Sequence, residues 1–146
     1  MTIWFDMDGT IADLYNVQNW LNRLRTYDPT PYEEARPLCS MNALASLLNA
    51  LQKRGYKVGI VSWLANDSTA EYERAVERSK YHWLRSHMPS VTFDHLIFTS
   101  YGVDKKRATG GGVLFDDNAE IREGWNDSDN RAYTPDKIFE VLRELL

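Results

Sequence analysis

Cysteine and long apolar runs are the scarcest features of this chain. Cys39 is the only cysteine among 146 residues, so an internal disulfide is excluded and a reducing environment is indicated. We expect Cys39 to be a small packed side chain rather than a reactive thiol. No apolar stretch reaches the roughly 18 residues of a membrane span, and no cationic leader precedes an apolar run. These absences favour a soluble, cytoplasmic protein.

Excess positive charge and metal-spaced histidines are also missing. The chain has 17 basic and 21 acidic residues and a formal net charge of −4, which argues against proteins that coat nucleic acids through bulk charge, although a local basic patch stays possible. His82, His87 and His95 show no metal-ligand spacing, and we interpret them as structural. Hydrophobic residues make up 43%, so the chain is long and apolar enough for one globular domain.

Short apolar strands alternate with helical patterns along the chain. The predicted strands cover residues 3–5, 57–62, 93–100 and 113–118, and the predicted helices cover 14–27, 40–55, 68–88, 119–124 and 134–146. The helix over 14–27 places Leu14, Val17, Leu21 and Leu24 at helical spacing, with Asp13 as its N-cap. Three prolines interrupt the pattern that follows, so residues 28–39 are expected to form an ordered loop or turn.

Two later segments carry more detailed expectations. The helix over 68–88 is expected to begin after Asp67 or Ser68 and to end before Pro89. Its inner face is predicted to contain Tyr72, Val76, Tyr81, Trp83 and Leu84. Residues 125–133 are expected to form a polar loop, and Thr134 and Pro135 fit the first positions of the last helix.

The alternation predicts an α/β fold: a three-layer α/β/α sandwich with a central parallel sheet. Polar residues follow three of the apolar strands: Asp6 and Asp8, Ser62, and Asp116 and Asp117. Ligands of such sheets bind beyond the carboxyl ends of the strands, where the strand order reverses. We therefore expect these side chains to meet at one edge of the sheet.

Asp6 and Asp8 pose an electrostatic problem. They would share one face if the first strand continued to residue 8, and two unpaired carboxylates there would repel each other. A hard divalent cation with oxygen ligands is the simplest remedy.

The ordered motifs resemble those of the haloacid dehalogenase-like superfamily of aspartate-nucleophile phosphohydrolases. The matching segments are FDMDGT after the first strand, IVS ending on Ser62, a lysine in YGVDKK, and VLFDD before a helix. The resemblance spans residues 3–124. It implies a Rossmann-like, haloacid dehalogenase-like domain over residues 1–146 and catalysis through an aspartyl-phosphate.

The resemblance also implies roles for the acidic residues. Asp6 would be the nucleophile, and Asp8 would be the general acid and then the general base. Asp6, the backbone carbonyl of Asp8 and Asp116 would bind Mg²⁺, with Asp117 holding a metal-bound water or orienting its neighbours.

Phosphate binding needs hydrogen-bond donors and a fixed positive charge. Ser62 and the backbone N–H groups of Met7 and Trp63 are candidate donors. Lys105 is favoured as the cation over its neighbour Lys106, and Arg107 is the third basic residue of the cluster.

Substrate choice in this superfamily depends largely on cap insertions over the site. Here only residues 14–39 are available as a small helical flap, and Tyr15 and Arg36 of this flap are candidate pocket residues. Trp63, directly after Ser62, is another candidate beside Ser62 and Lys105. The flap also carries Trp20, Tyr27 and Tyr32, and such aromatic side chains can stack on a base. Trp20 packing on the core is an equal alternative.

These observations favour a Mg²⁺-dependent phosphomonoesterase for a nucleotide or another small phosphorylated metabolite. Alternatives within the same chemistry are a phosphatase of nucleic-acid ends, a phosphotransferase and a mutase. A non-catalytic, phospho-accepting binding module is the alternative from another class. A receiver domain is disfavoured because the third predicted strand ends in Thr99-Ser100 without an aspartate.

Overall fold

The computed structural model describes residues 1–146 and contains a five-stranded parallel sheet. The strand order is β5-β4-β1-β6-β7. The bounds are Thr2–Phe5 for β1, Lys57–Trp63 for β4, His95–Thr99 for β5, Val113–Phe115 for β6 and Arg131–Tyr133 for β7. The chain runs outward from β1 to β4 and β5, and then returns to β6 on the other side of β1. The strand order therefore reverses at β1, where Asp6 follows the strand.

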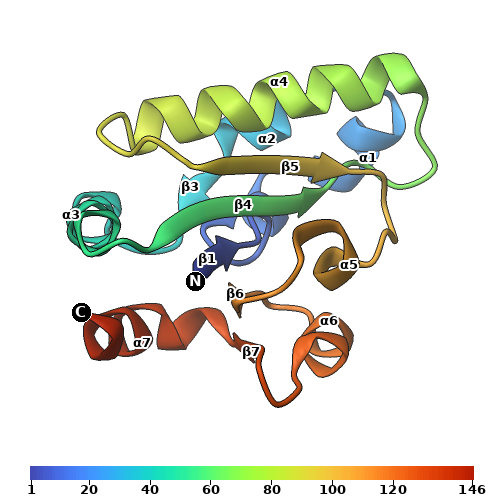
Figure 1. Ribbon diagram of the computed structural model, residues 1–146. Coiled ribbons are helices and arrows are strands. Elements are labelled where there is room, and N and C mark those ends of the chain that lie inside the picture. The colour runs from blue at the N-terminus through green and yellow to red at the C-terminus, as the bar shows by residue number, and fades with distance from the viewer.

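Helices cover both faces of this sheet (Figure 1). Their bounds are Trp20–Arg25 (α1), Pro31–Glu34 (α2), Met41–Lys53 (α3), Ala70–His87 (α4), Lys105–Thr109 (α5), Ala119–Trp125 (α6) and Ile138–Leu145 (α7). Two 3₁₀ turns cover Leu14–Asn16 and Pro135–Lys137. In Figure 1 the arrowheads of β4 and β5 point toward the side where α1 and the start of α4 lie. None of these helices has both the length and the apolarity that crossing a membrane requires.

The main core lies between the sheet and α3, α4 and α7. It includes alternate residues of the central strands, such as Ile3, Phe5 and Ile60, which face Leu48 of α3 and Trp83 of α4. The period of two along β1 and β4 brings these residues to one face. This buried layer fixes the ends of β1 and β4, and with them the start of the candidate site.

The opposite face is built around Trp4. Its indole lies over Gly59 of β4, stacks on His95 of β5 at a centroid distance of 5.4 Å and donates to the carbonyl of Gly111. A Cβ at position 59 would lie 2.6 Å from Cε3 of the Trp4 ring, so only glycine fits there. Trp125 of α6 completes this layer by donating to the carbonyl of Gly112.

The single helix predicted over residues 14–27 is wrong. The chain instead forms the 3₁₀ turn and then α1, separated by Asn19 with a positive φ of 57°. Asp13 does not cap a helix through its side chain, because its carboxylate accepts hydrogen bonds from Asn16 Nδ2. A leucine spacing of three and four residues cannot by itself exclude such a break.

Residues 28–39 are more regular than a loop. They contain α2 and the short strand β3 (Arg36–Pro37), which pairs antiparallel with β2 (Ala12–Asp13). Arg23 binds Asp28 at 3.0 Å and also pairs with Glu34. These local contacts order the segment between β1 and α3.

Several boundaries and positions also differ from prediction. α4 begins at Ala70, one or two residues later than expected, because Thr69 accepts the hydrogen bond from Tyr72 N and acts as its N-cap. Tyr81 is 44% exposed, so its predicted place on the inner face is wrong. The predicted loop over 125–133 contains β7, an edge strand whose short polar segment has no strong strand pattern.

Candidate functional site

A tight turn follows β1 and positions the first acidic residues. The carbonyl of Met7 accepts from the N–H groups of Thr10, Ile11 and Ala12, and Gly9 N donates to the carbonyl of Ala12. Gly9 has a φ of 80°, a conformation that favours glycine. A Cβ there would lie 2.8 Å from Cγ of Asp117 and 2.9 Å from Cε2 of Tyr15.

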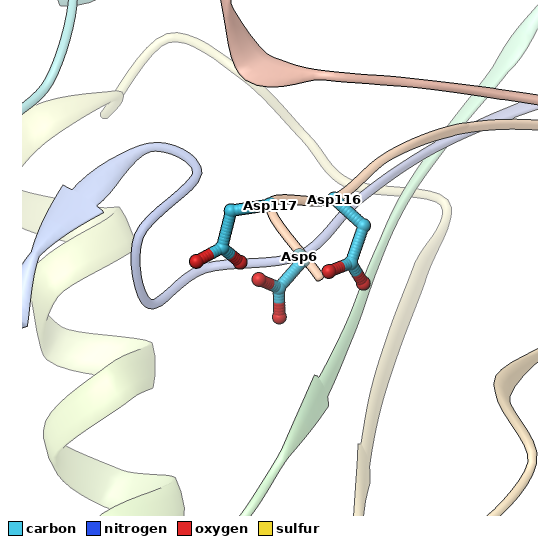
Figure 2. Close-up of side chains that lie close together, drawn as sticks. All are labelled: Asp6, Asp116 and Asp117. Atoms are coloured by element: carbon cyan, nitrogen blue, oxygen red, sulfur yellow. The ribbon is translucent and has the colours of Figure 1, made fainter. Parts of the chain in front are cut away.

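Three carboxylates gather beyond the carboxyl ends of β1 and β6. One oxygen of each of Asp6, Asp116 and Asp117 lies within 4.8 Å of the others. Figure 2 shows the three carboxylates pointing toward one another. The cluster forms because β1 and β6 are adjacent and in register, with Phe5 opposite Phe115. Asp6 N donates to the carbonyl of Phe115 and joins the two strand ends.

Lys105 supplies the positive charge of this cluster. Its Nζ donates to Oδ1 of Asp6 at 2.9 Å and to Oδ2 of Asp116 at 2.8 Å. Burial lowers the pKa of Lys105, but Asp6 and Asp116 together outweigh that effect and raise it. Lys106 lies outside the cluster and pairs with exposed Asp127 at 3.1 Å. Of the two adjacent lysines, the structure brings only Lys105 to the carboxylates.

Thr10 connects Asp6 with Asp117. Its hydroxyl donates to Oδ2 of Asp6 at 3.0 Å and accepts from the N–H of Asp117 at 3.2 Å. Thr10 is only 1% exposed. It belongs to the FDMDGT segment, but spacing alone did not indicate this bridging position.

Asp8 has a different environment from the three clustered carboxylates. Its Oδ2 accepts from Nζ of Lys80 at 2.9 Å. The same ammonium donates to Oγ of Ser62 and to the carbonyl of Trp63, each at 2.7 Å. Burial raises the pKa of the Asp8 carboxyl, and the opposing effect of Lys80 is smaller.

The sequence analysis missed Lys80. This residue is four positions after Val76, three before Trp83 and four before Leu84, so it shares their buried face of α4. Its relative exposure is 0%. A charged residue at the centre of an apolar helical face was the signal available in the sequence, because such a residue needs a buried partner.

A cavity of about 620 Å³ opens onto this group of side chains. Its charged lining residues include Asp6, Asp8, Lys105, Asp116 and Asp117. Its other walls are rich in aromatic residues: Tyr15, Trp20, Tyr27, Tyr32, Trp63, Tyr72 and Tyr101. The cavity therefore combines a charged floor with aromatic walls.

The predicted pocket residues take different positions. Tyr15 and Trp63 border the cavity, and the ring of Trp63 lies 5.3 Å from Nζ of Lys105. Arg36 does not reach it: this exposed side chain lines a separate, smaller cavity with Glu34 and Asp13. The antiparallel pairing of β3 with β2 turns Arg36 away. Arg25 of α1 is the arginine at the large cavity.

The acidic cluster fits a divalent cation. Four carboxylates (Asp6, Asp8, Asp116 and Asp117) face two buried ammonium groups (Lys80 and Lys105), which leaves two negative charges unbalanced at full ionisation. Burial and the nearby charge of Asp6 raise the pKa values of both Asp116 and Asp117. Crowded oxygen donors with excess negative charge suit a hard ion such as Mg²⁺. The histidines contribute nothing to this cluster.

Comparisons with known proteins show the fold. No family model matches this sequence, and no curated protein is similar to it. Among solved structures, the chain is similar to D,D-heptose 1,7-bisphosphate phosphatase from Burkholderia thailandensis. The TM-score is 0.54 at 11% identity, over 98% of this chain and 96% of that one. This likeness confirms the expected α/β fold with a central parallel sheet.

Proposed function

We propose that this protein is a Mg²⁺-dependent phosphomonoesterase that acts through an aspartyl-phosphate. The observation that carries the proposal is the convergence of Asp6, Asp116 and Asp117 with Lys105 at the floor of a cavity, with Asp8 beside them. The similarity of the fold to a known phosphatase supports the same function.

Asp6 is the nucleophile in this proposal. A carboxylate oxygen of Asp6 attacks phosphorus, and the bond between phosphorus and the ester oxygen breaks. Asp8 gives its proton to the departing oxygen. Water then attacks the aspartyl-phosphate while Asp8 takes a proton from it, so that inorganic phosphate leaves and Asp6 is regenerated. The raised pKa of Asp8 favours the protonated form that the first step requires.

Asp6, Asp116 and Asp117 would hold the metal ion, together with the backbone carbonyl of Asp8. When bound, Mg²⁺ neutralises charge on the phosphoryl oxygens. Lys105 keeps Asp6 and Asp116 oriented through its two hydrogen bonds.

Further donors for the phosphoryl group surround Asp6. The backbone N–H of Met7 donates to no acceptor within the protein, although Met7 is only 1% exposed. A buried N–H without a partner is costly, and a phosphate oxygen would satisfy it. Ser62, Lys105 and the N–H of Trp63 are the other donors in the proposal.

Residues 14–39 form the small cap in this proposal, and the substrate is a nucleotide or another small phosphorylated metabolite. The 3₁₀ turn, α1 and α2 contribute Tyr15, Trp20, Tyr27 and Tyr32 to the cavity walls. Tyr15 and Trp20 meet edge to face at 5.1 Å. Aromatic walls above a phosphate site suit a planar group such as a nucleobase.

A phosphatase screen tests the proposal. The substrates are nucleoside 5′- and 3′-monophosphates, sugar phosphates and 5′- or 3′-phosphorylated oligonucleotides, each with Mg²⁺ and with EDTA. We expect Mg²⁺-dependent release of phosphate with the highest kcat/KM on a nucleoside monophosphate. Preference for oligonucleotides would move the substrate to nucleic-acid ends. Release no faster than with EDTA for every substrate would contradict the enzymatic function and favour a binding module.

A further inference from the structure

The strongest feature without an assigned role is the buried ammonium of Lys80. We propose that Lys80 is a positioning residue that orients Asp8 and Ser62 for phosphoryl transfer, an inference that rests on the phosphatase function proposed above. The contacts that carry it are those to Asp8 Oδ2, Ser62 Oγ and the carbonyl of Trp63, at 2.9, 2.7 and 2.7 Å.

These contacts use the whole hydrogen-bonding capacity of the lysine. An ammonium has three N–H donors and no acceptor, and each donor of Lys80 has one protein acceptor. The ring of Tyr32 lies 5.0 Å from Nζ. Neither Lys80 nor Ser62 is among the residues that border the large cavity, whereas Asp8 is. Lys80 therefore acts through the carboxyl group of Asp8 and through the direction of the Ser62 hydroxyl, and does not itself touch the substrate.

The contact with Ser62 sets the direction of its hydroxyl. Because Oγ accepts from Lys80, the hydroxyl hydrogen must point away from the ammonium and is free for another acceptor. No protein acceptor takes that hydrogen. Ser62 is the last buried residue of β4 and is only 1% exposed. Lys80 thus makes Ser62 a donor, which is what a phosphoryl oxygen requires.

The contact with Asp8 restricts its carboxyl group. Oδ2 is held by Lys80, while Oδ1 has no protein hydrogen bond. Asp8 lies in the turn after β1 rather than in the strand, so the sheet does not orient it. The ammonium, reaching from α4, is the tertiary contact that selects one orientation and leaves Oδ1 for the proton exchanged with the leaving oxygen.

Stability alone does not explain a lysine at this position. The neighbouring inner positions of α4 include Val76, Trp83 and Leu84, and an apolar side chain of similar length would continue that face. Replacing a buried ion pair by hydrophobic residues is often neutral or stabilising, because the ions lose their hydration. The hydrogen bonds of Lys80 reach Asp8 in the turn after β1 and Ser62 and Trp63 of β4, and they agree with a role in positioning Asp8 and Ser62.

The test compares two substrates of similar shape, p-nitrophenyl phosphate and phenyl phosphate. Phenoxide is the poorer leaving group and depends more on the proton from Asp8 as the phosphorus–oxygen bond breaks. We expect Lys80→Met and Lys80→Gln to lower kcat/KM for phenyl phosphate about tenfold more than for p-nitrophenyl phosphate. Asp8→Asn should change the ratio in the same direction and by more.

Ser79→Ala is the matched control, since Ser79 is also buried and precedes Lys80 on the same helix. It should leave the ratio of the two kcat/KM values unchanged. The ratio does not depend on the amount of folded enzyme, so partial unfolding of a variant does not imitate the effect. Equal losses on both substrates, or absence of any folded protein for both Lys80 variants, would assign Lys80 a structural role only and overturn the proposal. If the wild type hydrolyses neither ester with Mg²⁺, the phosphatase function itself fails.

Discussion

Two buried lysines divide the candidate site into two regions with different designs. Lys105, at the start of α5, bridges two carboxylates and borders the cavity. Lys80, in the middle part of α4, binds one carboxylate, a hydroxyl and a carbonyl, and is not among the residues that border the cavity. The Lys105 region combines charge with access to a ligand. The Lys80 region uses the same type of side chain to orient neighbouring groups.

The comparison also separates the acidic residues. Asp6 and Asp116 both pair with the ammonium group of Lys105 and lie close to Asp117. Their region therefore keeps an excess of negative charge, which suits a cation. Asp8 is the only carboxylate that forms an ion pair with Lys80. Asp6 and Asp8 therefore have different environments although they are close in sequence, and this difference supports the proposed division between nucleophile and acid–base.

The largest expected effect is on the Lys105 region. Asp6→Asn should lower kcat by at least about 10⁴-fold, because the amide cannot form the acyl-phosphate link and a nucleophile has no substitute. Phosphate release measured at saturating substrate checks it. Asp129→Asn, at an exposed carboxylate outside the site, should keep wild-type activity. Equal activity of Asp6→Asn and wild type would show that Asp6 is not the nucleophile and that the Lys105 region is not the centre of the reaction.

Next in size is the difference between the adjacent lysines. Lys105→Ala should lower kcat/KM by about 10²-fold or more, since it removes the charge that faces the phosphoryl group. Lys106→Ala should stay within about threefold, because its partner Asp127 is an exposed side chain whose pairing contributes little. The reverse order would show that the wrong lysine has been placed in the site.

Metal binding should distinguish the two regions without a turnover assay. Millimolar Mg²⁺ should raise the Tm of the wild type, since a ligand at 100 times its Kd adds about 2.7 kcal/mol of stability. Asp116→Asn should reduce that increase strongly, whereas Ser62→Ala should keep most of it. Differential scanning fluorimetry with Mg²⁺ and with EDTA makes the measurement. If Mg²⁺ no longer raised the Tm of Ser62→Ala but still raised that of Asp116→Asn, the ion would bind in the Lys80 region instead.

The smallest effect is expected on the turn that joins both regions. Gly9→Ala should reduce the free energy of unfolding by about 1–3 kcal/mol, because the positive φ is strained and the new Cβ would collide with Asp117 and Tyr15. Urea denaturation provides the value. Gly124→Ala is the control: it lies in α6 with open space around it and should be neutral or stabilising by up to about 1 kcal/mol. Equal stability of the two variants would mean that the turn relaxes easily.

Much of the fold could be predicted because its signals are local. The helix predicted over residues 40–55 covers Met41–Lys53, with Ser40 as its N-cap, and Gly55 follows it with a φ of 98°. The apolar runs of β1, β4, β5 and β6 are strands. β7 escaped prediction because only three residues pair at the sheet edge, and that pairing depends on β6.

The chain by itself determined which acidic residues follow the strands, since strand ends and their polar neighbours are contiguous in sequence. Only the tertiary structure decided which ammonium groups meet them. Lys105 is 99 residues from Asp6, and Lys80 is 72 residues from Asp8. The packing of α5 and α4 around the ends of the strands selects these partners. That packing results from burial of many apolar residues together, a cooperative property that no single motif contains.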